Sequence, residues 1–261
     1  MLISIALYLA VAYIALALIA VFISNSIIFP APPSSYKLGE MRTAAIPSPG
    51  KGKIALLDAR SGKKRFHIIY CHGNGADLGR IAPLIKKMAD ELECDVTAFD
   101  YPGYGASDGK PSETSVLKAA ETVFEHLRQQ GIKENKIVIW GRSVGGGPAV
   151  HLATIHNVQA LILESAFKSA FSVPFGLNPL PFDKFDNISA IDKINCPLLV
   201  IHGREDSIIP FKHGEALYAK AKQPKQRLWF DDAGHNDIEY LHGEAIWKAV
   251  KDFIVDKKNM K

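Results

Sequence analysis

Cysteine is scarce in this sequence, and the three residues present have no pattern that suggests a structural role. Cys71, Cys94 and Cys196 each lie in or beside an apolar run, and none forms part of a C-x-x-C pair. A disulfide framework and a structural zinc site are therefore not expected. Three small buried side chains are the expected outcome.

The sequence also lacks a dense basic stripe, a long highly charged segment and a repeat of fixed period. Its net charge is +4, so nucleic-acid binding is not expected, although a mild excess of Lys and Arg suits an anionic membrane surface. With 261 residues, of which 48% are hydrophobic and 22% charged, the composition is typical of one large globular domain.

Charged residues are missing altogether from Leu2 to Ile23, and the first basic residue is Lys37. As a helix these 22 residues would span about 33 Å, enough to cross a hydrocarbon core. A secretory signal normally has a basic start and a small-x-small cleavage site; this segment has no basic residue, and Ser24-Asn25-Ser26 is a poor cleavage candidate. We therefore expect a retained transmembrane signal-anchor at 1–28 and a globular domain at 29–261, which begins with a stiff Pro-rich spacer. The side of the membrane and the oligomeric state stay open.

Strand-like runs and helical periodicities alternate along the rest of the chain. Strands are expected at 53–60, 65–71, 95–101, 136–140, 160–163, 198–202 and 227–230, and helices at 84–92, 112–130, 146–155, 212–222 and 237–255. The short linker 61–64 predicts that the first two strands form a hairpin. The alternation that follows predicts an α/β domain with a mainly parallel sheet, whose active site forms at the carboxyl ends of its strands.

One of these strand ends carries a Gly-Arg-Ser-Val-Gly motif, with Gly141 and Gly145 two residues on either side of Ser143. In a nucleophile elbow the serine lies on a strained strand-to-helix turn, and a Cβ at either glycine would collide with the neighbouring strand or helix. By itself this pattern arises by chance in about one chain of this length in ten. Its context decides the interpretation.

Two further polar residues follow strands in the order that a serine hydrolase requires. Asp206 follows the strand 198–202, and His235 follows the last strand. A serine hydroxyl needs a base to take its proton, and that base needs an acid to orient it. We therefore predict a catalytic triad of Ser143, His235 and Asp206. The backbone N–H groups of Val144 and Asn74 are the predicted oxyanion-hole donors.

The motifs His72-Gly73-Asn74-Gly75, Gly141–Gly146, His202–Asp206 and Gly234–Asp237 together resemble the α/β-hydrolase superfamily over residues 29–255. Within it the chain resembles membrane-anchored serine hydrolases, a group that includes protein depalmitoylases. This resemblance implies an α/β-hydrolase fold: a twisted, mainly parallel sheet of about eight strands, the first pair antiparallel, with helices on both faces. It also implies hydrolysis of acyl esters or thioesters.

The mechanism that we expect passes through an acyl-enzyme and needs no metal or other cofactor. Two alternatives remain open: a serine peptidase of the same fold, and an inactive membrane-anchored binding protein that kept the fold. An inactive protein would be expected to lack a triad member, and all three are present here.

Several other residues near these motifs have simpler interpretations. His72 and His202 are expected to bond loop backbone. Glu164 is expected to be solvated or to cap a helix; the alternative is that it orients His235. Arg142 is expected to form a structural ion pair; the alternative is that it binds a substrate carboxylate. A Phe- and Pro-rich segment at 166–190 is interpreted either as a small lid, with Phe171 and Phe175 binding the acyl group, or as a loop that packs its phenylalanines into the core.

Overall fold

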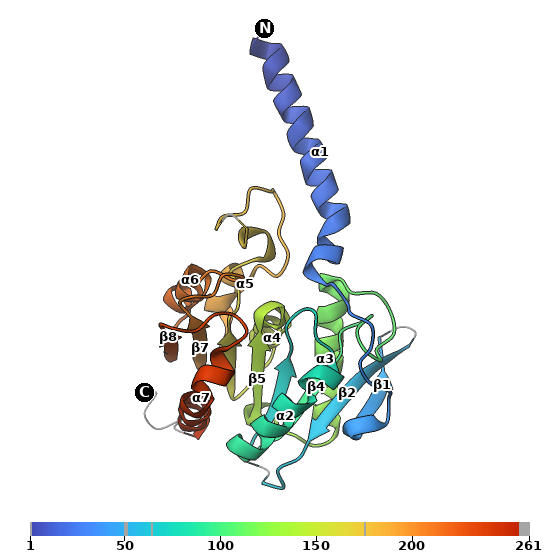
Figure 1. The fold of residues 1–261 in the computed structure, drawn as a ribbon, viewed down its shortest axis with the longest axis vertical. Coiled ribbons are helices and arrows are strands. Elements are labelled where there is room, and N and C mark those ends of the chain that lie inside the picture. The colour runs from blue at the N-terminus through green and yellow to red at the C-terminus, as the bar shows by residue number, and fades with distance from the viewer. Residues whose placement is uncertain (1, 50–51, 64, 175, 256–261) are drawn as a thin grey trace.

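A long N-terminal helix projects from an α/β body in the computed structural model, which describes residues 2–49, 52–63, 65–174 and 176–255 (Figure 1). The helices are α1 (Leu2–Ile28), α2 (Leu78–Leu92), α3 (Glu113–Gln129), α4 (Gly146–Ile155), α5 (Asn187–Ala190), α6 (Lys212–Lys220) and α7 (Ile238–Val255). The strands are β1 (Thr43–Pro47), β2 (Lys53–Ala59), β3 (His67–Cys71), β4 (Asp95–Phe99), β5 (Ile137–Arg142), β6 (Ala160–Glu164), β7 (Leu198–Gly203) and β8 (Lys225–Phe230).

The strands form an eight-stranded sheet in the order β1-β2-β4-β3-β5-β6-β7-β8. β1 pairs with β2, and β2 with β4, in antiparallel fashion, while every pair from β4 to β8 is parallel. The central strands β3 and β4 are buried along their whole length because helices cover both faces. The predicted α/β-hydrolase fold, with its mainly parallel sheet and antiparallel start, is confirmed.

The predicted hairpin between 53–60 and 65–71 is wrong. β2 instead pairs with β1, a strand that was not predicted from the sequence, and with β4 on its other side. β3 lies between β4 and β5 and runs parallel to both. Four linker residues are compatible with a hairpin, but linker length alone does not exclude a crossover to another position in the sheet.

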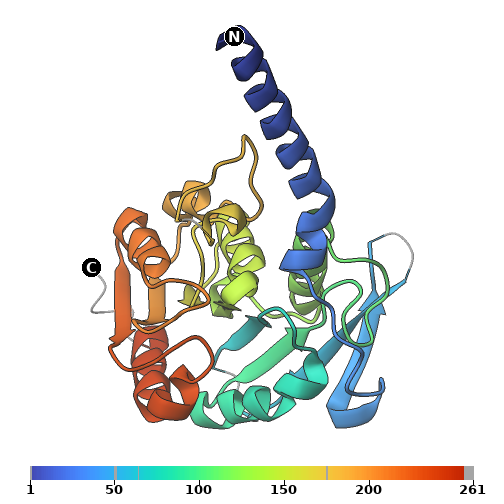
Figure 2. The same cartoon turned by 45° about the horizontal axis from the view of Figure 1, so that its top comes forward.

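The sheet separates two apolar clusters, one on each of its faces. Side chains of α3 and α4 pack on one face, and side chains of α2 and α7 pack on the other. All three cysteines are buried and free, as predicted. Figure 2 shows α1 projecting well beyond the α/β body.

Candidate active site

The candidate nucleophile lies on a sharp turn between β5 and α4. Ser143 directly follows β5 and opens a short 3-10 turn, Ser143–Gly145, that runs into α4. Its φ is 54°, in the left-handed region that residues other than glycine seldom occupy. Strain of this kind concentrates at functional sites and is typical of a nucleophile elbow.

Close contacts explain why the two residues that flank the serine turn, Gly141 and Gly145, are glycines. A Cβ on Gly145 would overlap the carbonyl oxygen of Cys71 in β3. A Cβ on Gly141 would lie 2.5 Å from the Cβ of Ala149 in α4. The predicted collision with the neighbouring strand and helix is therefore confirmed.

The structure brings the three predicted triad residues together from three strand ends. Ser143 Oγ lies 3.1 Å from Nε2 of His235, and Nδ1 of the same ring lies 2.7 Å from Oδ2 of Asp206. These residues follow β5, β8 and β7, respectively. All three are buried, so the contacts between them are shielded from bulk water.

Hydrogen bonds hold Asp206 in its ionised form. Its Oδ1 accepts the backbone N–H groups of Ile208 and Ile209, at 2.9 and 2.7 Å. Burial raises the pKa of this carboxyl, but hydrogen bonds from His202 and His235 more than offset that effect, so the pKa lies well below its usual value. A carboxylate at this place favours the His235 tautomer that carries its proton on Nδ1, which leaves Nε2 free to accept the serine proton.

The loop after β3 passes beside the nucleophile. A Cβ on Gly73 would lie only 3.5 Å from the Cβ of Ser143, so Asn74 follows immediately beside the turn. Among the described residues, the backbone N–H of Asn74 has no hydrogen-bond acceptor. Val144 contributes its N–H at the start of the helical segment that leads into α4. These two groups stay the predicted oxyanion donors.

The two other histidines at strand ends bond loop backbone, as predicted. His72 Nδ1 lies 2.7 Å from the Gly73 carbonyl oxygen, and His202 Nε2 lies 2.8 Å from that of Ile209. Nε2 of His202 also lies 3.3 Å from Oδ2 of Asp206, a contact that was not predicted from the sequence. His202 therefore contacts the same carboxylate oxygen of Asp206 as His235 does.

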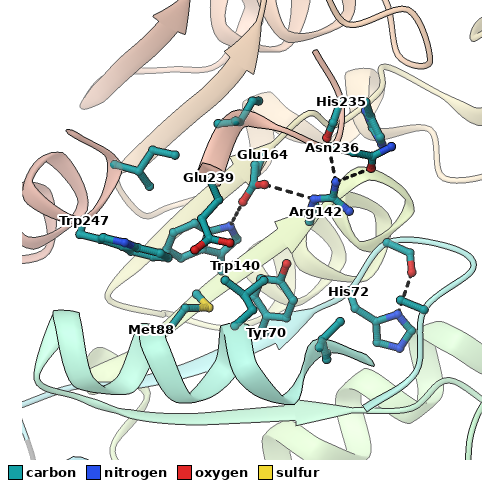
Figure 3. Close-up of a pocket in the computed structure, with 16 residues that line it drawn as sticks. Tyr70, His72, Met88, Trp140, Arg142, Glu164, His235, Asn236, Glu239 and Trp247 are labelled. Carbon is teal, nitrogen blue, oxygen red and sulfur yellow. Dashed lines mark hydrogen bonds and ion pairs between the residues drawn. The ribbon is translucent and has the colours of Figure 1, made fainter. Parts of the chain in front are cut away.

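Glu164 is neither solvated nor a helix cap, so that prediction is wrong, and it does not contact His235. Figure 3 shows its carboxylate between Trp140 and Arg142. It accepts the Trp140 indole N–H at 2.9 Å and the Arg142 Nε–H at 3.2 Å. Arg142 and Glu164 are register partners in the adjacent parallel strands β5 and β6, which places the two side chains on one face. The predicted structural ion pair of Arg142 is confirmed.

The same arginine holds the backbone of the candidate base. One terminal nitrogen of Arg142 donates to the carbonyl oxygen of His235 at 2.7 Å and to Oδ1 of Asn236 at 2.8 Å (Figure 3). A cavity of about 150 Å³ borders this ion pair between α2 and α7. Arg142 is thus a positioning residue, because it ties the loop that carries His235 to Glu164 at the end of β6. No sequence period indicates this contact.

Some phenylalanines of the segment 166–190 pack into the core, and others are left for the alternative role of a lid that binds the acyl group. Phe167 and Phe185 are buried in the core. Phe171 is half-buried and packs edge-on against Phe182, with ring centroids 5.7 Å apart. Phe175 lies outside the described residues. An acyl-binding role for Phe171 and Phe175 stays a prediction.

Comparison with known proteins gives the family. The family model described as serine aminopeptidase, S33, matches residues 62–175, a range that includes Ser143 but ends before Asp206 and His235. Human alpha/beta hydrolase domain-containing protein 17B is 37% identical over 206 residues, which cover 77% of this chain and 71% of the relative. Mouse alpha/beta hydrolase domain-containing protein 17C is 37% identical over 193 residues, 73% of this chain and 60% of the relative.

Solved structures share the fold at lower identity. An esterase from Pyrococcus furiosus superposes with a TM-score of 0.71 at 19% identity and covers 86% of this chain and 95% of its own. Mouse alpha/beta hydrolase domain-containing protein 10 gives a TM-score of 0.64 at 18% identity, with 81% and 98% covered. From its fold and its identity to these relatives, the chain belongs to the α/β-hydrolase superfamily and, within it, to the serine hydrolases of the alpha/beta hydrolase domain-containing protein 17 family.

Proposed function

We propose that this chain is a membrane-anchored serine hydrolase that cleaves carboxylic ester or thioester bonds of acyl substrates. The observation that carries the proposal is the continuous chain of contacts from Ser143 Oγ through the His235 ring to Asp206. It occurs at a strained elbow, the place where an α/β-hydrolase presents its nucleophile.

In this mechanism Ser143 Oγ attacks the acyl carbonyl carbon while His235 Nε2 takes the serine proton. Asp206 stabilises the imidazolium that forms. The N–H groups of Val144 and Asn74 donate to the oxyanion, and loss of one such donor typically costs about 10²–10³ in rate. The tetrahedral intermediate expels an alcohol or thiol, which leaves with the proton from His235. Water, deprotonated by the same histidine, then releases the acid.

The membrane part of the proposal rests on α1. A stretch of 25 residues, Ser4–Ile28, has a mean hydropathy of 2.7, and most of its side chains are exposed, although Ser24 near its end is buried. An apolar helix of this length, exposed along its surface, suits the interior of a bilayer. An acyl substrate is apolar enough to reside in the same bilayer.

A serine peptidase is the second candidate function, because the matched family model describes a serine aminopeptidase. A triad and an oxyanion hole serve amides as well as esters. The two candidates differ in the leaving group, so a set of acyl esters, acyl thioesters and aminoacyl amides distinguishes them.

The experiment uses the full chain in detergent, with a fluorophosphonate probe and this substrate set. We expect the probe to label the wild type but not Ser143→Ala, and ester or thioester turnover to fall by about 10³-fold or more in Ser143→Ala and His235→Ala. Asp206→Asn should impair turnover while the chain stays folded.

Ser189→Ala is the matched control, because Ser189 is an exposed serine outside the site. An unlabelled wild type would favour the inactive binding protein. Turnover of amides alone would favour the peptidase.

A further inference from the structure

The chain between α1 and the first strand is attached to the domain. Figures 1 and 2 both show it continuing from α1 along the α/β body towards β1. We call residues 29–36 the linker. Its two end residues, Phe29 and Tyr36, are buried, with 3% and 7% of their surfaces exposed, whereas most residues between them are exposed. The predicted Pro-rich spacer is therefore docked on the domain at both ends of the linker.

The first docking point lies against the helix that follows the nucleophile. The ring of Phe29 packs edge-on against Phe185, with centroids 5.8 Å apart. A Cβ on Gly147, in the first turn of α4, would overlap the same Phe185 ring, so that ring lies directly on the helix. The short turn from Ser143 into α4 carries the predicted oxyanion donor Val144. The start of the linker thus packs against the element that holds one donor.

The second docking point lies at the end of the loop that carries the other predicted donor, Asn74. The Ser35 N–H and hydroxyl both donate to the carboxylate of Asp77, at 2.6 and 2.5 Å. Asp77 is fully buried and is the N-cap of α2, where it also accepts the Arg80 N–H at 3.1 Å. A Cβ on Gly79, in the first turn of α2, would overlap Ser35 Oγ. The linker is thus packed on the helix start that follows the loop.

Tyr36 extends this docking to a buried acid behind the same loop. Its hydroxyl donates to Oδ2 of Asp100 at 2.5 Å. Asp100 is fully buried, and its Oδ1 accepts the Leu78 N–H at 3.0 Å. The same oxygen lies 3.9 Å from Nε2 of His72, at the start of the loop. One carboxylate therefore connects the linker to both ends of the loop that carries Asn74.

The position of this loop bears on the rate of the proposed reaction. An oxyanion hole works because its donors are fixed before the negative charge forms, and a displacement of about 1 Å can cost about 10²-fold in rate. Asn74 lies between Gly73 and Gly75, so the loop's own residues restrict its backbone little. Its side chain also donates to the Ile28 carbonyl oxygen at 3.5 Å, a long contact at the end of α1. The rigidity of the loop must come from the segments that pack against it.

We propose that the linker positions the two oxyanion donors of the hydrolase. Ser35 is a positioning residue that acts through the Asp77 carboxylate, and Tyr36 is one that acts through the carboxylate of Asp100. This inference rests on the proposed function. It makes the chain next to α1 part of the framework of the active site, so that a change in the linker changes the rate of acyl transfer.

The test compares full-length variants in detergent, with 4-nitrophenyl butanoate as the substrate. The double variant Ser35→Ala/Tyr36→Phe removes both hydroxyls and keeps the aromatic ring and the backbone. Gly79→Ala leaves the linker sequence intact and displaces the linker from α2. We expect kcat to fall by about tenfold in both, with KM within about twofold of wild type, because the donors stabilise the oxyanion and not the bound ester.

Two further measurements isolate the oxyanion hole and its loop. An alkyl trifluoromethyl ketone forms an adduct with the serine that places an oxyanion in the hole, so its inhibition constant should rise by about the same tenfold. Hydrogen exchange should show faster deuterium uptake in peptides that cover residues 72–80, and unchanged uptake in β6.

Three control variants separate positioning from the loss of a hydroxyl or of stability. Ser189→Ala and Tyr240→Phe remove hydroxyls from exposed side chains outside the site, Tyr240 being 89% exposed. Ser112→Ala removes the N-cap hydroxyl of α3 and should lower stability alone. All three should keep the kcat and the inhibition constant of the wild type.

Wild-type kcat and inhibition constant in the linker variants, or unchanged uptake at 72–80, would overturn the proposal and leave the hydrolase function standing. A rise in KM alone would do the same, as would an equal loss of kcat in Ser112→Ala, since the cause would then be stability. If the double variant does not fold, Gly79→Ala decides the outcome. A wild type that neither turns over the ester nor reacts with the fluorophosphonate would remove the proposed function, and this inference with it.

Discussion

At the scale of single residues, the candidate site depends on contacts that leave no space for substitution. Ser143 has a left-handed φ, and the two flanking glycines let β3, β5 and α4 meet behind it. Arg142 then ties the backbone of His235 to Glu164. The glycine spacing is visible in the sequence because the steric requirement is local. The arginine contact is not visible, because it joins residues 93 positions apart.

Gly145→Ala should be among the most damaging single substitutions. Gly145 has a helical φ of −63°, which alanine adopts readily, so the penalty comes from the overlap of the new Cβ with the Cys71 carbonyl oxygen. We expect the free energy of unfolding to fall by roughly 3 kcal/mol or more, together with loss of fluorophosphonate labelling. Urea unfolding of the solubilised chain measures the first effect.

Gly243→Ala in α7 is the control for this substitution. Its Cβ would meet its neighbours only at 3.4 Å or beyond, an ordinary contact. Gly243 directly follows a kink at His242, so the helix propensity of alanine counts only in part, and this change should alter the free energy of unfolding by less than about 1 kcal/mol. Equal behaviour of the two variants would contradict the steric explanation.

At the scale of elements, the type and position of most helices and strands could be predicted, but one pairing could not. Helix α3 was expected at 112–130 and forms at Glu113–Gln129, with Ser112 as its N-cap. Its boundaries follow from local signals: a capping box before it and Gly131, with φ 86°, after it. No local signal indicates which strands pair with β2, because the pairing depends on where β1 and β4 lie in the sheet.

Ser112→Ala should therefore destabilise the chain without affecting its chemistry. Ser112 Oγ accepts the Ser115 N–H at 3.1 Å, and the Ser115 hydroxyl accepts the Ser112 N–H at 2.9 Å. Loss of this cap should cost about 1 kcal/mol in urea unfolding. The rate of fluorophosphonate labelling should stay that of the wild type, as in Ser189→Ala. A large loss of labelling, or no change in stability, would show that the cap has a different role.

At the scale of the whole molecule, buried neutral histidines link stability to pH. His67 is the first residue of the central strand β3, with Nε2 2.8 Å from Thr97 Oγ1, and burial lowers its pKa to about 4. In the unfolded chain the same group titrates near its ordinary value of about 6.5. Between these two values the unfolded state binds more protons, so stability falls as the pH falls.

We expect the free energy of unfolding to decrease from pH 7 to pH 4, with His67 contributing roughly 3 kcal/mol at the acid end. In His67→Gln this contribution is absent, so the slope of stability against pH should be shallower over the same interval. Urea unfolding at pH 7, 5.5 and 4.5 measures both slopes. Identical slopes would mean that His67 is not held neutral in the folded chain.

The sequence by itself determined the alternation of strands and helices, the mainly parallel sheet and the glycine-flanked serine turn, because each depends on residues within a few positions of one another. Only the tertiary structure decided the order of strands at the start of the sheet and the role of Glu164. It also decided the contact between Tyr13 and Pro179, which are 166 positions apart. Contacts of that separation depend on how packed elements meet in space, and no local period or spacing encodes them.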